Sequence, residues 1–385
     1  VYAFPEGTIM YPNEPVLTVV APLIDAQIVE TAILAQVNHQ SLVATKTARI
    51  VKAAEGKAVS DFGARRAHNM DAAVYGARAS YIGGAAGTAT VLAGQMFGIP
   101  VSGTMAHSWV MYYKDEYEAF KHYAENYPDN TVLLVDTYDT IKSGIPNAIR
   151  VAKEVLEPMG KRLKGIRIDS GDLAYQSIKV RKMLDDAGLQ DCKVMVSNSL
   201  DEHTISSLNM QKARIDGYGV GERLITGASS DYSEDSISLL GAVYKIAAVE
   251  ENGEFSPRIK VSGSVEKITN PGLKKVYRVY DQNGKAKADL IAKADETIDM
   301  STEFRFVDPD MPWRNLKFTH CTVKPLQEKI FENGKLIYKL PTLEEIRAYV
   351  KKQLEEEIWE EEQRFVNPHK HYMDMTPDYY DMKMS

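Results

Sequence analysis

The chain has 385 residues, 44% of them hydrophobic and 26% charged, which is typical of a globular protein with one large domain and a second one. Its net charge of −7 argues against nonspecific nucleic-acid binding, which needs a basic surface, and no apolar run is long enough to span a bilayer. Two cysteines far apart in the sequence, Cys192 and Cys321, supply neither a disulfide framework nor a zinc site, and they indicate a reducing, cytoplasmic location.

The first part of the chain predicts extended segments followed by one long helix. Residues 5–20 contain turns and short extended pieces, whereas from Asp25 to about Ala54 the apolar residues recur at helical spacing. The first residue is Val1 rather than Met, and no signal-peptide pattern follows it. We therefore expect that the numbered chain lacks its natural N-terminal segment.

The middle of the chain alternates between predicted strands and predicted helices. Strands are predicted at 58–61, 99–103, 131–136, 164–169, 192–197 and 216–220, and helices within 69–97, 115–126, 146–157, 173–187 and 201–212. Such alternation indicates right-handed βαβ units and a parallel sheet. About six units fit an irregular, incomplete α/β barrel better than a closed eightfold one.

After residue 230 the pattern becomes rich in β-strands. Strands are predicted at 242–249, 258–261 and 274–280, in a smaller antiparallel sheet. Thr342 and Glu345 form a capping-box pattern at the start of a helix. We interpret the glutamate run at 355–362 as a solvated helix face. The tail at 367–385, with His369 and His371, is interpreted as a surface tail rather than a metal site.

Polar residues follow the predicted parallel strands. The carboxyl ends of such strands meet at one rim, which is where α/β proteins carry their active sites. Two of these strand ends are rich in small residues, Ser197–Asn198–Ser199 and Gly219–Val220–Gly221. Exposed backbone N–H groups there could bind phosphate, and a tight turn is the alternative interpretation of the glycines.

Two other strand ends are acidic. They carry Asp136 with Asp139, and Asp169 with Asp172. Carboxylates on neighbouring strands can hold Mg²⁺ or sugar hydroxyls, or can orient a histidine. The alternative is helix capping, which we accept for Asp172 because it precedes a helix and reject for Asp169 because it directly ends a strand.

His107 is the candidate catalytic group. It follows a predicted strand and should share the rim with Asp136 and Asp169, which would make its imidazole a stronger nucleophile or base. Arg65 and Arg66 follow the first strand of this sheet and could bind a carboxylate or pyrophosphate, with a surface salt bridge as the alternative. Together these residues predict phosphoryl or phosphoribosyl transfer.

Five ordered motifs closely resemble the nicotinate phosphoribosyltransferase family. They are Ser60–Asp61–Phe62–Gly63–Ala64–Arg65–Arg66–Ala67, Gly103–Thr104–Met105–Ala106–His107–Ser108, Asp136–Thr137–Tyr138–Asp139, Arg167–Ile168–Asp169–Ser170–Gly171–Asp172 and Gly219–Val220–Gly221–Glu222–Arg223–Leu224. Their order and spacing match across roughly residues 5–250. The resemblance implies an α/β fold of the type II phosphoribosyltransferase kind. An irregular catalytic barrel at 56–245 would be joined to a mixed α+β domain built from 1–55 and 246–385.

The resemblance also implies the reaction and the partners. Nicotinate and phosphoribosyl pyrophosphate would give nicotinate mononucleotide and pyrophosphate, coupled to ATP hydrolysis through a phosphohistidine at His107, with Asp136 and Asp169 as further catalytic residues. Mg²⁺ would accompany the phosphates, and no metal ligand is assigned. A cytoplasmic homodimer with small-molecule substrates is implied, with no role for nucleic acid or a membrane.

Matching positions imply substrate-binding roles. Arg167 and Asp169 would bind the ribose and phosphates, and Asp61 and Arg65 would bind the base. The 5′-phosphate would lie at Asn198, Gly219 and Gly221. The other implied substrate-binding residues are Arg66, Thr104, Ser170 and Gly171. Two differences from the family stand out. We expect its ring-stacking aromatic residue to lie in the missing N-terminal segment, and the segment 229–238 is longer and more acidic than in the family.

Other functions stay open at this point. The nearest is nicotinamide phosphoribosyl transfer, against which the arginine pair favours an acid substrate. The quinolinate enzyme has no place for the His107 motif, and an aldolase or isomerase barrel would need a lysine or glutamate at a strand end. A chain that binds phosphoribosyl ligands without turnover is the non-enzymatic alternative.

Overall fold

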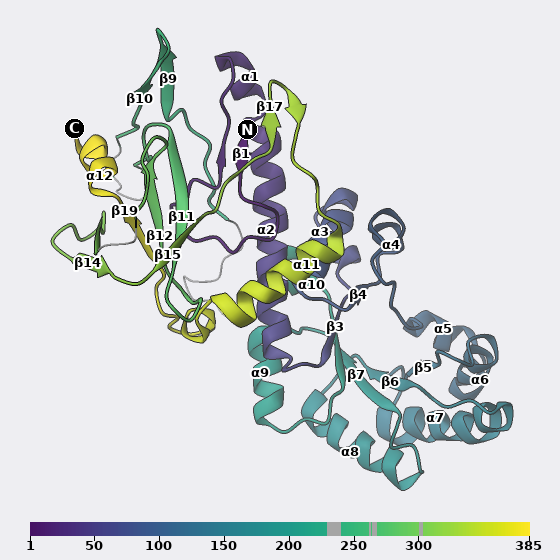
Figure 1. Ribbon diagram of the computed structural model, residues 1–385. Coiled ribbons are helices and arrows are strands. Elements are labelled where there is room, and N and C mark those ends of the chain that lie inside the picture. The colour runs from purple at the N-terminus through teal and green to yellow at the C-terminus, as the bar shows by residue number, and fades with distance from the viewer. Residues whose placement is uncertain (229–239, 262, 264–267, 300–302) are drawn as a thin grey trace. The chain divides into compact units, whose positions relative to one another are not determined.

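The computed structural model describes residues 1–228, 240–261, 263, 268–299 and 303–385 (Figure 1). The chain divides into two compact units, one formed by residues 38–240 and the other by 1–37 together with 241–385. The long helix α2 (Glu30–Ala53) contributes to both. The acidic segment at 229–238 lies outside the described residues.

The 38–240 unit is built on a six-stranded parallel sheet (Figure 1). Its strands are β3 (Ala58–Asp61), β4 (Gly87–Thr88), β5 (Val132–Leu134), β6 (Gly165–Ile168), β7 (Lys193–Ser197) and β8 (Gly217–Val220), in the order β4-β3-β8-β7-β6-β5. Strand residues such as Leu133, Ile166 and Val194 are fully buried, as expected for a parallel sheet whose strands are connected by helices. The expected incomplete α/β barrel is confirmed.

The helices of this unit follow the predicted alternation. They are α3 (Met70–Ile82), α4 (Val91–Phe97), α5 (His107–Tyr112), α6 (Glu116–Asn126), α7 (Ile145–Val151), α8 (Leu173–Asp186), α9 (Glu202–Met210) and α10 (Glu222–Thr226), with a short 3₁₀ turn at η1 (Ala64–Arg66). The helix predicted at 146–157 begins earlier and is less regular than expected. A π-helical turn η2 (Thr140–Gly144) precedes α7, and a second one, η3 (Ala152–Leu156), and the 3₁₀ turn η4 (Glu157–Met159) follow it.

One predicted strand is wrong. The segment 99–103 forms only a single bridge, between Val101 and Thr88, and β4 takes the place in the sheet. The helix predicted within 69–97 is interrupted at Gly83 and Gly84, where the φ of Gly84 is 112°. Proline at position 100 cannot donate a ladder hydrogen bond, which explains why the later segment contributes so little pairing.

The second unit contains a mixed six-stranded sheet made from distant parts of the chain. Its strands are β11 (Lys274–Tyr280), β12 (Ala286–Lys293), β13 (Phe304–Val307), β14 (Asn315–Phe318), β15 (Thr322–Pro325) and β19 (Tyr372–Met375), in the order β14-β13-β19-β12-β11-β15. Only the β12–β19 pair is parallel among these pairings. The buried side chains of Val279, Leu290, Phe306 and Phe318 form its core.

Smaller elements complete the second unit. They are β1 (Tyr2–Ala3), β2 (Leu17–Thr18), β9 (Ala248–Glu251), β10 (Glu254–Pro257), β16 (Glu328–Lys329), β17 (Phe331–Glu332), β18 (Lys335–Leu336), α1 (Leu23–Ile28), α11 (Leu343–Lys352), η6 (Gln353–Glu357), η7 (Glu360–Gln363) and α12 (Pro377–Met384). The capping box of Thr342 and Glu345 forms as predicted at the start of α11. The strand expected at 274–280 is confirmed as β11. The segment 258–261 forms no strand, and the strand expected at 242–249 begins only at Ala248, as β9.

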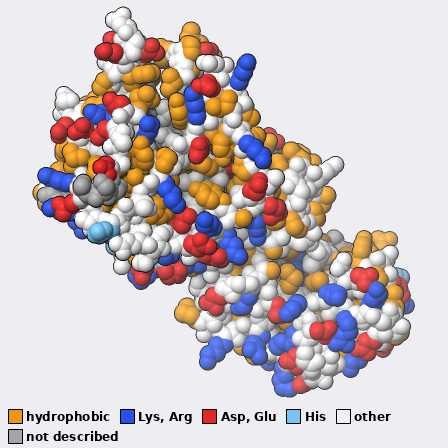
Figure 2. All heavy atoms as spheres, in the orientation of Figure 1, with side chains coloured by type: hydrophobic (Ala, Val, Ile, Leu, Met, Phe, Trp, Pro, Cys, Tyr) orange, Lys and Arg blue, Asp and Glu red, His pale blue; other side chains and the backbone are white. Residues whose placement is uncertain are grey.

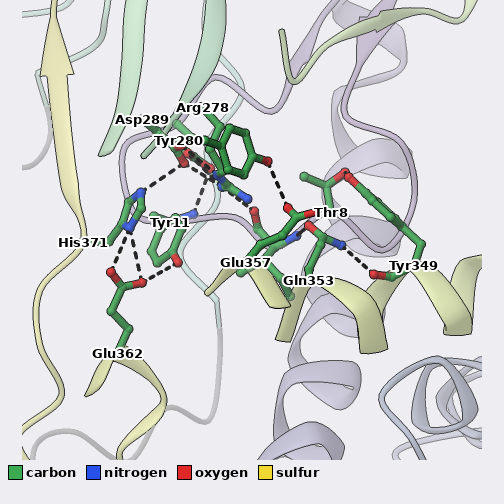
Figure 3. A network of polar contacts seen from close by, with 12 residues as sticks. Thr8, Tyr11, Arg278, Tyr280, Asp289, Tyr349, Gln353, Glu357, Glu362 and His371 are labelled. Carbon is green, nitrogen blue, oxygen red and sulfur yellow. Dashed lines mark hydrogen bonds and ion pairs between the residues drawn. The ribbon is translucent and has the colours of Figure 1, made fainter. Parts of the chain in front are cut away.

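The C-terminal tail is not a surface appendage, because its strand β19 lies between β12 and β13. His371, just before β19, is buried in a polar network (Figure 3). Its Nε2 lies 3.5 Å from Asp289, its Nδ1 lies 3.2 Å from Glu362, and its ring stacks on Tyr11 with centroids 3.7 Å apart. Asp289 also holds the fully buried Arg278 through two hydrogen bonds of 2.8 and 2.6 Å. The interpretation of the glutamate run as wholly solvated is therefore wrong at Glu362.

Candidate active site

His107 and the ends of β5 and β6 form a compact polar cluster. His107 is the first residue of α5, and its Nδ1 lies 3.1 Å from the hydroxyl of Thr137. Its Nε2 lies 3.5 Å from Asp169 and 4.0 Å from Asp136. The imidazole is 40% exposed and the Asp136 carboxylate 2%, so the ring is open to solvent on one side and faces negative charge on the other. The predicted sharing of a rim by His107, Asp136 and Asp169 is what the structure shows.

The two carboxylates are held by their own neighbours. One oxygen of Asp136 accepts hydrogen bonds from the backbone N–H of Asp169, at 2.9 Å, and from the hydroxyl of Ser170, at 2.6 Å. Its other oxygen is buried without a hydrogen-bond partner among the described residues. Asp169 accepts a 2.5 Å hydrogen bond from the hydroxyl of Ser197, at the end of β7. Three adjacent strands therefore fix the carboxylates on which His107 depends.

Arg167 supplies a partly buried positive charge beside these carboxylates. It lies on β6, its guanidinium centre is 5.6 Å from the centroid of the Phe62 ring, and its Nε is buried without a hydrogen-bond partner in the described part of the chain. Burial lowers the pKa of Arg167, and the nearby charges of Asp169 and Asp136 counteract this effect. An arginine with unused donors at the carboxyl end of a parallel sheet is suited to bind an anion.

Asp61 lies below the surface instead of facing a ligand. The residue is fully buried, and its two oxygens accept hydrogen bonds from the hydroxyl of Thr88, at 2.7 Å, and from the backbone N–H of Gly63, at 2.8 Å. Burial raises the pKa of Asp61. Its contacts join the end of β3 to β4 and shape the turn that carries Phe62 and Arg65.

The two arginines of the first motif are placed differently. Arg66 lies 3.4 Å from Glu222, and both side chains are 61% exposed, which is the surface salt bridge considered as the alternative. Arg65 is exposed and lines an open depression with Met70, Ala73 and other residues of α3 and α4. Its charge acts on Arg167 and contributes to lowering the pKa of that side chain.

The strand ends predicted to bind phosphate have unusual backbones. Asn198 and Ser199 both have positive φ, at 86° and 53°, a conformation that costs energy in residues other than glycine. Gly219 has no room for a side chain, because a Cβ there would lie 2.5 Å from the Phe62 ring, and Gly221 precedes the short helix α10. Close packing against Phe62 therefore explains the glycine at position 219 as well as phosphate binding does.

The remaining predicted positions lie on loops: Ser170 and Gly171 follow β6, and Thr104 precedes α5. Gly171 has a φ of 76° and is followed by Asp172, which caps α8 as expected by accepting a hydrogen bond from the N–H of Tyr175. The hydroxyl of Thr104 donates a hydrogen bond to the carbonyl of Met105 at 3.3 Å.

Sequence reasoning assigned no such contacts to three side chains that complete the cluster. Thr137, Ser197 and Phe62 contact His107, Asp169 and Arg167, respectively. Each lies at a strand end within or beside a motif, and that position was the available signal. Asp139, by contrast, caps η2 by accepting hydrogen bonds from Ile141 and Lys142, so capping is its observed role.

No group of three or more histidine, cysteine or acidic residues in the described segments is arranged to hold a metal ion. Within those same segments, every helix is too short or too polar to cross a membrane. Figure 2 shows acidic and basic side chains interspersed over the visible face, in keeping with the modest net charge of −7.

A solvent-accessible histidine beside two carboxylates, an arginine with an unpartnered donor and strained strand ends on a parallel α/β sheet are the features of an enzyme that transfers phosphorylated groups. Comparison with known proteins narrows this class. The model of the nicotinate phosphoribosyltransferase (NAPRTase) family matches residues 57–289, and the model of the nicotinate phosphoribosyltransferase C-terminal domain matches residues 273–383.

Individual relatives agree with the family models. The chain is 48% identical to a nicotinate phosphoribosyltransferase of Bacillus subtilis over 386 residues, which covers 100% of the chain and 76% of that protein. It is 31% identical to the human nicotinate phosphoribosyltransferase over 402 residues, covering 90% of the chain and 72% of the relative. The crystal structure of the human nicotinic acid phosphoribosyltransferase matches 99% of the chain and 81% of its own length, with a TM-score of 0.83 and 28% identity. The chain belongs to the nicotinate phosphoribosyltransferase family.

Proposed function

We propose that this chain transfers the phosphoribosyl group of phosphoribosyl pyrophosphate to nicotinate, and that ATP drives the reaction through phosphorylation of His107. The observation that carries the proposal is the position of His107, whose two ring nitrogens face a hydroxyl on one side and two carboxylates on the other. Membership of the family supports the choice of substrates.

The surroundings of His107 favour one ring nitrogen as the nucleophile. The carboxylates of Asp136 and Asp169 attract the ring proton to Nε2, which leaves the lone pair on Nδ1. Thr137 is placed to orient that nitrogen. Attack by Nδ1 on the γ-phosphorus of ATP forms a P–N bond and breaks the P–O bond to ADP, which leaves with the electron pair. Water later cleaves the P–N bond and releases phosphate.

The phosphoribosyl step relies on positioning. The ring nitrogen of nicotinate forms a bond to C1 of the ribose while the C1–O bond breaks, and pyrophosphate leaves with the electron pair. Arg167, with its unused donors, would meet the anionic groups of the phosphoribosyl substrate, and Asn198 and Gly221 would lie along its 5′-phosphate. Arg65 would face the nicotinate carboxylate, and Asp61 would act by holding the turn that presents Arg65.

Mg²⁺ would enter with the phosphates of the substrate. Such an ion needs only one or two protein carboxylates, and Asp136 and Asp169 offer them, since one oxygen of Asp136 is unpartnered and Asp169 is 25% exposed. When bound, Mg²⁺ neutralises charge on the departing pyrophosphate. We also propose a cytoplasmic homodimer; the two buried free cysteines support the reducing compartment.

Labelling with ATP tests this proposal. Purified protein incubated with γ-phosphate-labelled ATP is expected to acquire acid-labile phosphate, and ATP should stimulate formation of nicotinate mononucleotide from nicotinate and phosphoribosyl pyrophosphate. In His107→Ala both effects should fall to background, because the nucleophilic nitrogen is gone. His122→Ala removes a partly exposed histidine of α6 and is the control that should behave like the unaltered protein. Undiminished labelling of His107→Ala would contradict the proposal.

A further inference from the structure

Glu116 is a buried carboxylate close to the His107 cluster that has no part in the function proposed above. It is the first residue of α6 and is 3% exposed. One of its oxygens accepts a 2.5 Å hydrogen bond from the hydroxyl of Ser143 and a 3.1 Å hydrogen bond from the side-chain amide of Asn147. Glu116 therefore fastens the start of α6 to η2 and α7.

The other end of this connection is the helix that carries His107. The indole N–H of Trp109, in α5, donates a 2.9 Å hydrogen bond to the carbonyl of Ala119, in α6. Because His107 and Trp109 share the six-residue helix α5, the position of the imidazole is tied to α6. Any shift of α6 relative to the sheet would carry His107 with it.

The segment that Glu116 holds leads directly to Thr137 and Asp136. Asp139 caps η2, and the backbone N–H groups of Ser143 and Gly144 donate to its carbonyl at 3.0 and 2.9 Å. The turn packs against β5 so closely that a Cβ at Gly144 would lie 1.8 Å from the carbonyl oxygen of Val135. The residues just after Val135 are those that face His107, so η2 and the end of β5 move as one piece.

Glu116 also lies close enough to Asp136 for their charges to interact. Burial raises the pKa of Glu116, its hydrogen bonds with Ser143 and Asn147 counteract this, and the charges of Asp136 and Asp139 raise it further. Its second oxygen is buried without a hydrogen-bond partner among the residues that the structure describes. Burying a carboxylate costs free energy, which hydrogen bonds offset. The hydrogen bonds of Glu116 join the two backbone segments that meet at His107.

We propose that Glu116 is a positioning residue for His107, acting as a brace between α6 and η2 that sets the separation of the imidazole from Thr137 and Asp136. The inference rests on the proposed function, because it concerns the step in which His107 receives phosphate. Substrate binding at Arg167 and Arg65 uses other strand ends and does not depend on the brace.

The test separates labelling of His107 from phosphoribosyl transfer without ATP. Glu116→Ala removes the acceptor and is expected to slow phosphate uptake from labelled ATP by about 10-fold. The KM values for nicotinate and phosphoribosyl pyrophosphate, and the rate without ATP, should stay within about 2-fold of the unaltered protein. Glu116→Gln keeps an oxygen for Ser143 and Asn147 and should restore most of the uptake. Glu118→Ala, a partly exposed position on the same helix, is the matched control.

Ser143→Ala cuts the same brace from the other side and serves where Glu116→Ala does not fold. The two substitutions together should cost little more than either alone, because they break one connection. Uptake equal to that of Glu118→Ala, or an equal loss of the reactions with and without ATP, would overturn the inference. If the unaltered protein takes up no phosphate, the proposed function itself has failed, and that result is recognised before any variant is compared.

Discussion

Arg65 and Arg66 are adjacent in sequence but have different surroundings. Arg66 is paired with Glu222 on the surface, whereas Arg65 lies close enough to Arg167 for their charges to interact. Two neighbouring positive charges repel each other, and an anion bound near both of them offsets that repulsion. The nicotinate carboxylate is the group that would relieve this repulsion in the proposed function.

Replacement of Arg65 tests that assignment. Arg65→Ala is expected to raise the KM for nicotinate by about 10-fold or more, because a hydrogen bond between charged groups contributes about 1.5–3 kcal/mol. Any weak activity with nicotinamide, which has no carboxylate, should change far less. Steady-state kinetics with both substrates provides the measurement, and Arg66→Ala is the matched control. An unchanged nicotinate KM would remove Arg65 from the base site.

At the residue scale, the proximity of the candidate residues could be predicted from the sequence, but the contacts that hold them in place could not. His107, Asp136 and Asp169 were predictable because they follow apolar strands, and parallel strands place such residues at one rim. Glu116 carries no comparable signal, because its contacts are with Ser143 and Asn147, which lie far along the chain. Asp61 looked like a binding residue, and only the structure shows that both of its oxygens are used internally.

At the scale of elements, the π-helical turn η2 is the feature that shapes the site. A π turn widens the helix locally, and such turns frequently occur at functional sites. Here the turn follows the end of β5 and brings Gly144 against the carbonyl of Val135. No side chain larger than hydrogen fits there without moving either the strand or the helix.

Gly144→Ala is therefore expected to destabilise the protein by about 1–3 kcal/mol, the usual cost of overpacking, in spite of alanine's better helix propensity. Urea unfolding measures this difference. Gly103→Ala is a suitable control, because a Cβ there meets nothing within 4 Å. A stabilised Gly144→Ala would show that the turn can relax, and it would weaken the argument that η2 and β5 form one piece.

Element boundaries were predicted well wherever breakers coincide with the end of a pattern. Asp172 and Gly188 enclose α8, and the strand expected at 274–280 is β11. The strand β4 was missed because two residues are too short to show a periodicity, and β19 was missed because its burial comes from pairing with β12, some 80 positions earlier in the chain. Pairing over such a distance leaves no mark on local sequence.

At the scale of the whole molecule, the buried network of the second unit joins three parts of the chain (Figure 3). Tyr11 comes from the N-terminal part, Arg278 and Asp289 from the β11–β12 hairpin, and Glu362 and His371 from the C-terminal part. Burial and the neighbouring Asp289 carboxylate raise the pKa of Glu14, which lies 3.9 Å from Arg278. Breaking one member of such a buried group leaves other charges unpaired.

His371 gives this network a dependence on pH. Burial favours the neutral imidazole, but the nearby carboxylates of Asp289 and Glu362 outweigh it and raise the pKa of His371 above its usual value of 6.5. The stabilisation is therefore fully present below pH 6.5 and is lost as the pH rises through the higher value in the folded state. His371→Gln should destabilise the unit by about 3 kcal/mol at pH 6 and by less at pH 9.

Hydrogen exchange at the amides of β12 and β19, followed at both pH values, measures that difference. His369→Gln alters an exposed histidine two positions earlier and should leave the exchange rates unchanged. Equal losses of protection in His371→Gln at pH 6 and pH 9 would show that the charge of the imidazole contributes nothing.

The contrast between the two units has a consequence for synthesis on the ribosome. All strands of the parallel sheet lie within one continuous stretch, so that unit can complete its contacts soon after residue 240 emerges. The other unit must wait for nearly the entire chain, because β1 pairs with β16, and β19 fills the space between β12 and β13. Residues 1–37 are therefore made long before β16, which completes the pairing of β1, and this late pairing lengthens the time for which β1 offers an unpaired strand edge to chaperones and proteases.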